Sequence, residues 1–507
     1  MIPDRVLRFI WTLFLSTLGI FVLCQPAMAA KAHHTMSPLL RLGSQEALAQ
    51  APTGVVAPQY GLFGCQVGLS VGQCYDPYQM RRAYQIDTLI TAGYDGTGHT
   101  IVIVDAYQNP NLLAQVAFFD AFYGLPAINL TQVAPDGLTP FVVGDPNMTG
   151  WAEEISLDVE WAHAIAPGAN IVLVLAKSNM DADILSALKY AVDHNLGDII
   201  SMSFGENESC VDPDLLSGYH DVFAAATQKN ITLFASSADQ GAALQTCDGN
   251  SWVKAVSMPA SDPLVTGVGG TELRAADFCL VSLGCNPATH PLPGTWQSEI
   301  VWNEGLPFGD FGDVFGIGTL ATGGGYSVLF DEPPYQKGTS GLHGGKQRAV
   351  PDVAYNGAVL HGVLTYLAIP GVPTGFYRFG GTSAGAPQWA AIAAIANQKA
   401  GKRLGFLNKA IYQIGKVNNA YPADFHDITN GTNSAVEFDS ADNPVTIIGF
   451  DAAIGWDATT GFGSPIAPSM VDDLIRYVSP GDGTSAIATT KPKPHPKPIV
   501  PGSMDPH

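Results

Sequence analysis

One serine lies between a glycine-rich turn and an apolar helical pattern. Ser383 is part of Gly-Thr-Ser-Ala-Gly-Ala (381–386), and Pro387 follows at once. Small neighbours let a substrate approach the backbone closely, and proline suits the first turn of the helix predicted over 389–398. Ser383 is therefore a candidate nucleophile, although such loops also occur where they only pack. A mechanism further needs a base, an orienting group and an oxyanion donor.

The base is predicted to be a carboxylate rather than a histidine. None of the 12 histidines lies in a His-Gly-x-His motif, and no glycine turn accompanies His163. Glu154 and Asp158 are four residues apart, so on a helix their β-carbons lie about 5–6 Å from each other. Two carboxylates that close tend to share one proton, which raises the pKa of one of them and suits proton relay in acid. The alternative is a solvated acidic stripe.

A third carboxylate follows an apolar strand pattern. The apolar run covers residues 231–238, and Asp239 follows it directly, two residues before Gly241. In open parallel sheets the carboxyl ends of the strands face the binding crevice, so Asp239 is placed for function if this strand is parallel. An aspartate at a strand end is also an ordinary turn former.

The surrounding pattern predicts the elements that position these residues. Strand-like runs at 100–105, 171–176, 198–204 and 231–238 alternate with helical patterns at 112–122, 182–194 and 215–229. Such alternation predicts an α/β fold with a mostly parallel sheet flanked by helices and joined by right-handed crossovers.

Several separated motifs occur in a fixed order from about residue 74 to 478. They are Gly-Thr-Gly (96–98) before Ile-Val-Ile-Val-Asp-Ala-Tyr (101–107), Glu154 to Asp158, Ala-Asp-Gln-Gly (238–241), Met-Pro-Ala-Ser-Asp-Pro (258–263) before Gly-Gly-Thr (269–271), Val-Trp-Asn-Glu-Gly (301–305), Gly-Gly-Gly-Tyr-Ser (323–327), Pro-Asp-Val-Ala (351–354), 381–387, Asp-Ile-Thr (427–429) and Gly-Trp-Asp (455–457). In this ordered set the chain resembles the sedolisins, serine-carboxyl peptidases with a subtilisin-like fold. Each motif alone is weak, but the ordered set is highly specific.

The resemblance implies a role for each candidate. Ser383 would be the nucleophile, and Glu154 the general base and later the general acid. Asp158 would orient Glu154 and share its proton, while Asp239 would donate to the oxyanion. A carboxyl group donates a hydrogen bond only when it is protonated, so the enzyme is expected to act in acid. The reaction would be acyl transfer through an acyl-enzyme that water then cleaves.

The resemblance also implies one structural calcium ion. Its ligands would be the carboxylates of Asp427 and Asp457 and the carbonyls of Ile428, Ala453 and Gly455. An all-oxygen set of this kind suits Ca²⁺ rather than zinc or copper. Ala453 stands where relatives often carry glycine, a small change because only the carbonyl would coordinate. The alternative is a pair of Asx-type turns.

Composition limits the possible functions. The chain has 507 residues, is 46% hydrophobic and carries a formal net charge of −21; its mean hydropathy is +0.14 and its pI about 4.7. Length alone suggests about three domains, but one motif series favours a single large catalytic domain, 61–478. The acidic balance excludes nucleic acid as a partner, because such binding needs a basic surface. We expect a monomer that acts on protein or peptide substrates.

The N-terminus predicts export. Arg5 and Arg8 precede an apolar run, 9–24, and Ala-Met-Ala (27–29) offers a cleavage site, so 1–29 is predicted to be a signal peptide. The apolar run is shorter than the roughly 20 residues of a membrane span, which disfavours the alternative of a retained anchor. We therefore expect a secreted or extracytoplasmic protein with no stable membrane insertion after cleavage.

Six cysteines follow the predicted signal peptide, an even number that suits an oxidising compartment. Six cysteines allow 15 pairings. Spacing favours three of the possible pairs over free buried thiols: Cys65 with Cys74, Cys210 with Cys247, and Cys279 with Cys285.

One stretch and two positions depart from the family pattern, and a second stretch is unusual in composition. Residues 30–60 are a short linker, too short for a core of their own, where relatives carry a large folded prodomain; a prodomain is either absent or supplied separately. Residues 479–507 are rich in proline and lysine and predict an extended, disordered tail. Phe204 stands where some relatives have tryptophan, and Asp105 where some have glutamate. Both changes could alter the proton network behind Glu154 and with it the pH optimum.

These observations together predict a secreted, acid-acting, calcium-stabilised serine-carboxyl endopeptidase. The alternative from another class is a catalytically silent secreted relative that binds proteins or a wall polymer through its tail. A binding module has no reason to keep Ser383, Glu154, Asp158 and Asp239 together, which argues against it. A subtilisin-type hydrolase ranks third because the histidine motif is missing.

Overall fold

The computed structural model describes residues 35–39, 41–49, 62–68, 72–279, 285–286, 288–305, 318–342, 346–417, 421–478 and 491–493. The predicted signal peptide, 1–29, lies outside these residues. So does the predicted tail, 479–507, apart from 491–493.

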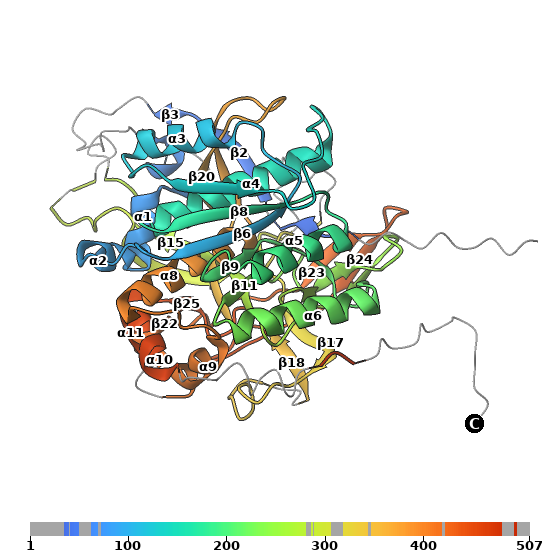
Figure 1. Ribbon diagram of the computed structural model, residues 1–507. Coiled ribbons are helices and arrows are strands. Elements are labelled where there is room, and N and C mark those ends of the chain that lie inside the picture. Colours follow the sequence, from blue (N-terminus) through green and yellow to red (C-terminus); the bar gives the residue numbers. More distant parts are fainter. Residues whose placement is uncertain are drawn as a thin grey trace, which may run out of the picture. The chain divides into compact units, whose positions relative to one another are not determined.

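An eight-stranded sheet forms the centre of the fold (Figure 1). Its strands run in the order β16-β15-β11-β9-β6-β8-β7, and β19 also pairs with β15. They are β6 (Thr100–Ala106), β7 (Asn129–Val133), β8 (Asn170–Ala176), β9 (Ile199–Met202), β11 (Thr232–Ser236), β15 (Thr266–Ala275), β16 (Trp296–Val301) and β19 (Val353–Asn356). Every pairing is parallel except that of β15 with β16. The predicted mostly parallel sheet is confirmed.

One predicted strand, 198–204, is divided in the structure. β9 ends at Met202 and β10 (Phe204–Asn207) begins two residues later. β9 lies between two parallel neighbours of the central sheet, whereas β10 leaves that sheet and pairs antiparallel with β14 (Ser257–Met258). The strand-like sequence pattern over 198–204 gave no sign of this change of partner.

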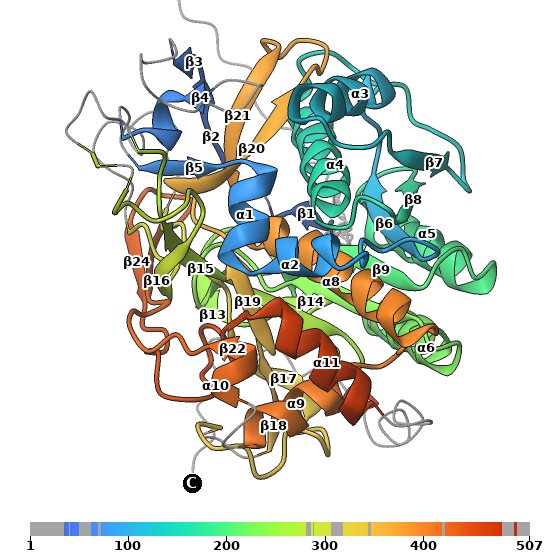
Figure 2. The ribbon, with the colours of Figure 1, turned by 90° about the vertical axis from the view of Figure 1, so that its left-hand side faces the viewer.

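Helices cover both faces of the sheet. α4 (Pro146–Ile165) packs against α8 (Gly385–Ala400), and both contact strands of one face. α5 (Asp181–Asp193) and α6 (Pro213–Gln228) pack together on the other face (Figure 2). α4 begins where the Asp145 side chain accepts the Met148 N–H, and Pro146 occupies its first turn. Most residues of α4 are buried, including three of its four acidic ones, Glu154, Asp158 and Glu160.

A second sheet of four strands has the order β2-β21-β20-β5. These are β2 (Arg41–Glu46), β21 (Gly375–Gly380), β20 (His361–Leu367) and β5 (Gln73–Tyr75). β2 belongs to the predicted linker, 30–60, as do β1 (Ser37–Pro38), which pairs with β10, and β3 (Leu48–Ala49), which pairs with β4 (Leu62–Phe63). The described part of this linker therefore contributes strands to the fold.

The remaining elements surround these two sheets. The helical ones are η1 (Gly64–Gln66), α1 (Pro77–Ala83), α2 (Ile86–Thr91), α3 (Leu112–Tyr123), η3 (Thr382–Ala384), α9 (Asn408–Lys416), α10 (Tyr421–Asp424) and α11 (Ala467–Tyr477). The short strands are β12 (Ala243–Gln245), β13 (Trp252–Lys254), β17 (Gly325–Asp331), β18 (Gln347–Val350), β22 (Phe425–His426), β23 (Ala435–Phe438), β24 (Pro444–Ile447) and β25 (Ser464–Pro465).

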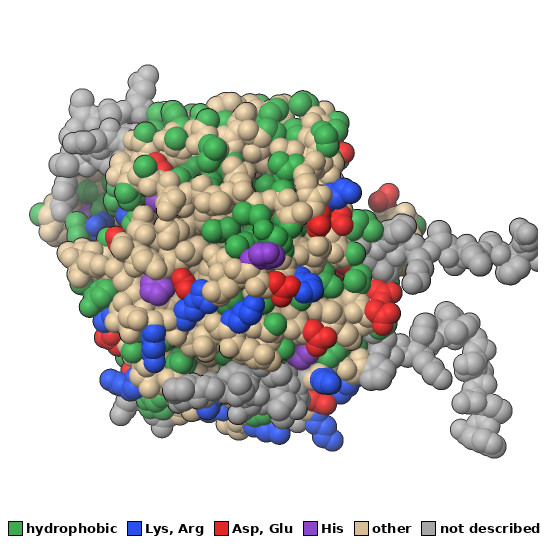
Figure 3. Space-filling view, viewed as in Figure 1, with side chains coloured by type: hydrophobic (Ala, Val, Ile, Leu, Met, Phe, Trp, Pro, Cys, Tyr) green, Lys and Arg blue, Asp and Glu red, His purple; other side chains and the backbone are tan. Residues whose placement is uncertain are grey.

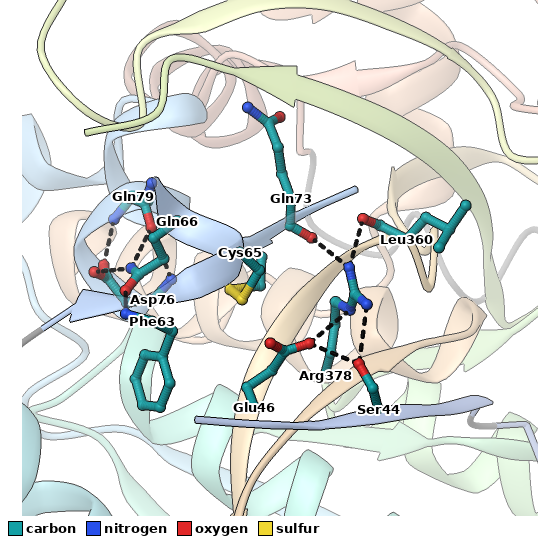
Figure 4. Close-up of a disulfide and its surroundings, with 11 residues drawn as sticks. Ser44, Glu46, Phe63, Cys65, Gln66, Gln73, Asp76, Gln79, Leu360 and Arg378 are labelled. Carbon is teal, nitrogen blue, oxygen red and sulfur yellow. Dashed lines mark hydrogen bonds and ion pairs between the residues drawn. A yellow bond between two sulfur atoms is a disulfide. The ribbon is translucent and has the colours of Figure 1, made fainter. Parts of the chain in front are cut away.

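All three predicted disulfides are confirmed: Cys65–Cys74, Cys210–Cys247 and Cys279–Cys285. Figure 4 shows the first of them beside the second sheet. Of the predicted tail, Lys493 donates its backbone N–H to Leu329 of β17 (2.8 Å) and pairs with Asp331 (2.6 Å).

The surface carries charges of both signs. On the face in Figure 3, acidic and basic side chains intermingle over the lower half, and uncharged side chains predominate above. A search of the described helices finds none with the length and apolar character needed to span a bilayer.

Candidate active site

Ser383 lies in the short turn η3, between the end of β21 and the start of α8. Gly381 has φ = +100°, a conformation open to glycine but costly for other residues, and it turns the chain from the strand into the helix. Ser383 is fully buried. Its Oγ donates to Glu154 Oε2 at 3.1 Å and lies 3.3 Å from the carbonyl oxygen of Ser203.

The two carboxylates predicted from their spacing lie on α4, as expected, and both are fully buried. A third carboxylate, Asp105 at the end of β6, is buried with them. Burial raises the pKa of Glu154 well above its ordinary value, the charges of Asp158 and Asp105 raise it further, and the Ser383 hydrogen bond opposes the rise.

The other two members of the cluster behave alike. Burial raises the pKa of Asp158 to about 8, against the effect of hydrogen bonding with Ser203 and Glu154. Burial also raises the pKa of Asp105 well above its ordinary value, and the charge of Asp158 adds to it. Among the described residues no lysine or arginine pairs with any of the three. We call these residues the carboxyl cluster, and in acid it holds protons.

Asp239 follows β11, as the strand pattern predicted, and is fully buried. Its Oδ1 accepts both the backbone N–H and the hydroxyl of Thr382, each at 2.8 Å. The preceding residue, Ala238, has φ = +101°, which is strained for a residue with a β-carbon and is typical of functional sites. Thr382 ties Asp239 to the loop that carries Ser383. Sequence reasoning missed Thr382, for which adjacency to the serine was the only signal.

The two positions that depart from the family pattern both lie at this site. Asp105 belongs to the carboxyl cluster itself. The ring of Phe204 lies 6.0 Å from that of Trp151, one turn of α4 before Glu154. The backbone around Ser203 was not anticipated: its carbonyl lies beside Ser383 Oγ because the chain leaves the central sheet there.

A segment from the predicted linker also reaches the nucleophile. The Leu39 carbonyl oxygen accepts the Ser383 backbone N–H at 3.2 Å. Nothing in the composition of residues 30–60 pointed to this contact.

The predicted calcium ligands meet in one cluster of loops. Both oxygens of Asp427 accept the Gly455 N–H, at 3.1 and 3.2 Å, and Asp457 Oδ2 accepts the Ala453 N–H at 3.0 Å. Asp457 also forms the Asx turn of the alternative interpretation, because its Oδ1 accepts the Thr459 N–H. No hydrogen bond from a described residue reaches the carbonyls of Ile428, Ala453 and Gly455. Two carboxylates beside three uncommitted carbonyls fit a hard cation.

Comparison with known proteins agrees with the fold and with the motifs. Residues 142–434, more than half of the chain, match the Subtilase family. Kumamolisin of Bacillus sp. (strain MN-32) is 33% identical over 412 residues, 80% of this chain and 64% of that protein. Sedolisin of Pseudomonas sp. (strain 101) is 27% identical over 401 residues, 77% of this chain and 59% of that protein. The chain belongs to the subtilases and, within them, to the sedolisins.

More distant relatives and a solved structure extend the comparison. This sedolisin is 26% identical to tripeptidyl-peptidase 1 of Rattus norvegicus over 357 residues, 66% of this chain and 54% of that protein. The chain thus spans a little over half to about two thirds of the length of these relatives. The structure of Pseudomonas sedolisin, a serine-carboxyl proteinase, superimposes with a TM-score of 0.64 at 24% identity and covers 81% of this chain and 100% of its own. This likeness shows the subtilisin-like fold.

Proposed function

We propose that this sedolisin is a serine-carboxyl endopeptidase that hydrolyses peptide bonds of proteins in acid. The observation that carries the proposal is the hydrogen bond from Ser383 Oγ to Glu154, within a buried carboxyl cluster with which no lysine or arginine of the described residues pairs. A carboxylate in this place can accept the serine proton, and its raised pKa lets it return that proton to a leaving amine.

Each residue of the site then has a defined role in the reaction. Ser383 attacks the peptide carbonyl while Glu154 takes its proton, and Glu154 next protonates the departing amine. Water cleaves the acyl-enzyme with the same carboxylate as base. Asp158 holds Glu154 in place and shares its proton. Asp239, when protonated, and the Ser383 N–H stabilise the oxyanion.

The enzyme is expected to act in acid because its oxyanion donor, Asp239, is a carboxyl group. An ionised Asp239 would repel the oxyanion, so activity requires it to be protonated. Asp105 is a buried acidic neighbour of both Asp158 and Glu154, and it favours one more proton in the cluster. Hydrolysis should therefore peak in acid and decline toward neutrality.

Calcium is proposed to stabilise the C-terminal loops. Asp427 and Asp457, with the carbonyls of Ile428, Ala453 and Gly455, would hold the ion. When bound, it supplies a positive charge that fixes these loops against one another. We further propose that the enzyme is secreted and monomeric, and three disulfides suit an oxidising compartment.

A single assay tests the proposal. Hydrolysis of an acid-denatured protein is followed by peptide release from strong acid to mild alkali, with Ser383→Ala as the negative control and Glu153→Gln as a matched control on α4. We expect a maximum in acid for the wild type and Glu153→Gln, and no peptide release by Ser383→Ala. A wild type without hydrolysis at any pH would favour the silent binding protein. A maximum in alkali would contradict the carboxyl mechanism.

A further inference from the structure

A cavity of about 390 Å³ lies where α10 and α11 pack together, and Figure 2 shows these two helices side by side. None of the residues that line it belongs to the carboxyl cluster or to the proposed calcium ligands. The cavity is therefore a feature that neither the proposed reaction nor the calcium site explains. The polar residues of its wall are Asp424, Ser469, Asp472, Asp473, Arg476 and Tyr477.

Asp424, the last residue of α10, is fully buried. No described residue donates a hydrogen bond to either of its carboxylate oxygens. Its backbone carbonyl accepts the Ile466 N–H at 2.8 Å, at the start of α11, so the residue is held in place. A buried carboxylate without donors is costly unless a proton or a cation neutralises it.

Two side chains of α11 face Asp424, and neither compensates its charge. The Ser469 hydroxyl donates to two backbone carbonyls, so its oxygen keeps lone pairs for a ligand. Asp473 adds a second carboxylate, and its Oδ1 pairs with Arg476 at 2.7 Å. The Arg476 side chain is 67% exposed, and because such surface pairs contribute little to stability, the guanidinium can leave Asp473 to a stronger partner.

The other charged groups near α10 also leave Asp424 without a cationic partner. Asp472 pairs with Lys399 of α8. Lys416 of α9 donates to two backbone carbonyls, and His426 of β22 stacks on an indole ring. Among the described residues, the elements that pack against α10 therefore supply no cation that pairs with Asp424.

The donor set suits a hard cation. Two carboxylates and a hydroxyl offer oxygen atoms only, the ligands that Mg²⁺ and Ca²⁺ prefer. Ca²⁺ takes about six to eight oxygens, whereas Mg²⁺ keeps several of its waters and is bound through one or two carboxylates. A water molecule fills about 30 Å³, so the cavity has room for a cation together with its waters.

We propose that Asp424 and Asp473 hold a hydrated divalent cation of the magnesium class, with Ser469 Oγ as a further donor, and that this cation joins α10 to α11. The site goes beyond the proposed peptidase function and does not depend on it. Carboxylate ligands must be ionised, so the cation binds near neutrality and leaves in mild acid. It therefore stabilises the folded chain at a pH at which the proposed mechanism is inactive.

The test is a titration of the full chain with Mn²⁺ at neutral pH, followed by electron paramagnetic resonance. Mn²⁺ accepts the same oxygen ligands as Mg²⁺. The chain carries Ser383→Ala to prevent proteolysis and Asp457→Ala to remove the proposed calcium site. We expect one bound Mn²⁺ per chain, which Mg²⁺ displaces. No bound Mn²⁺ at concentrations up to about 1 mM would overturn the proposal, and a proton shared with Asp473 would then be what neutralises Asp424. Displacement by Ca²⁺ at far lower concentration than by Mg²⁺ would contradict the magnesium class.

Three variants locate the ion. Asp424→Asn and Asp473→Asn should each weaken Mn²⁺ binding by at least about tenfold, because loss of even an outer-shell partner of a metal costs about 10- to 100-fold. Asp472→Asn is the matched control, since it removes the same charge one residue away. Asp472 is 56% exposed and paired with Lys399, so affinity should change by less than about threefold. Equal losses in all three variants would indicate attraction by surface charge and would contradict a defined site.

A second measurement does not depend on the folding of a variant at the site. Crystals soaked in Mn²⁺ at neutral pH should show an anomalous scattering peak between Asp424 and Asp473. Mg²⁺ should also raise the melting temperature of the Asp457→Ala chain at neutral pH but not in mild acid. A peak at other positions only, or a melting temperature that Mg²⁺ leaves unchanged at neutral pH, would refute the site and leave the peptidase proposal intact.

Discussion

Two groups of buried carboxylates in this molecule are treated in opposite ways. Asp352 is fully buried and forms a two-pronged pair with fully buried Arg348, at 2.5 and 2.6 Å. It also accepts the Gly267 N–H (2.8 Å) and the Tyr412 hydroxyl (2.9 Å). The carboxyl cluster of Glu154, Asp158 and Asp105 is equally buried but lacks a cation among the described residues.

The presence or absence of a cation distinguishes a carboxylate with a structural role from carboxylates that can take part in catalysis. Arg348 compensates the charge of the paired carboxylate, and the pair holds β18 and β19 in place. The carboxyl cluster can be neutralised only by protons, and burial raises the pKa of each member. A buried carboxylate that lacks a cation and touches a serine is therefore a stronger indication of function than burial alone.

The largest expected effect is the loss of activity when the serine or its carboxylate partner in the carboxyl cluster is removed. Ser383→Ala, Glu154→Ala and the double variant should each lower kcat by about four to six orders of magnitude, because nucleophile and base act as one unit. Steady-state kinetics in acid on one peptide substrate measures this. Losses that multiply in the double variant would mean that the two residues act independently.

For the free energy of unfolding the order should be reversed: a substitution in the Arg348–Asp352 pair should cost more than one in the carboxyl cluster. Asp352→Asn leaves a buried arginine without its partner and should cost about 3–5 kcal/mol. Asp158→Asn in acid replaces one neutral group by another of similar shape and should cost less than about 1.5 kcal/mol, the worth of a hydrogen bond. Urea unfolding of both variants in acid gives the comparison. A greater loss in Asp158→Asn would show that the cluster is ionised there.

The pH dependence of stability sharpens the same contrast. The pKa of Asp158 is raised by folding, from about 3.9 in unfolded chains to about 8. Its contribution is therefore fully present below about pH 4 and is lost as the pH rises toward 8, with a slope of up to about 1.4 kcal/mol per pH unit. Melting temperatures across this window should fall, and less steeply in Asp158→Asn. An unchanged slope in that variant would locate the titration elsewhere.

Sequence reasoning found the elements of the site but not their connections. The spacing of Glu154 and Asp158 gives their shared helix face, and the apolar run before Asp239 gives its strand end, because both depend on local periodicity. The Thr382–Asp239 bonds and the strained Ala238 depend on two loops meeting, more than 140 positions apart. Leu39 is further still from Ser383, and a short strand inside a predicted linker carries no periodic signal.

Calcium removal should have a smaller effect than breaking the buried pair. A ligand that binds only the folded state stabilises it by about 2.7 kcal/mol when its concentration is about 100 times its Kd. Chelation in mild acid or Asp457→Ala should lower the melting temperature accordingly, and a chelator should have no further effect on the variant. Superimposable melting curves with and without chelator, together with no calcium by elemental analysis, would refute the metal site.

The smallest expected effect is a shift of the pH profile. Asp239→Asn keeps an oxygen for the two Thr382 donors and adds an amide N–H that can face the oxyanion at any pH. The variant should retain part of its activity, and the decline of kcat/KM toward neutrality should move to higher pH because its donor does not titrate. The carboxyl cluster still titrates in this variant, so the profile should broaden rather than become flat. A decline at the wild-type pH would mean that the cluster alone sets the acid optimum and that Asp239 is not the titrating oxyanion donor.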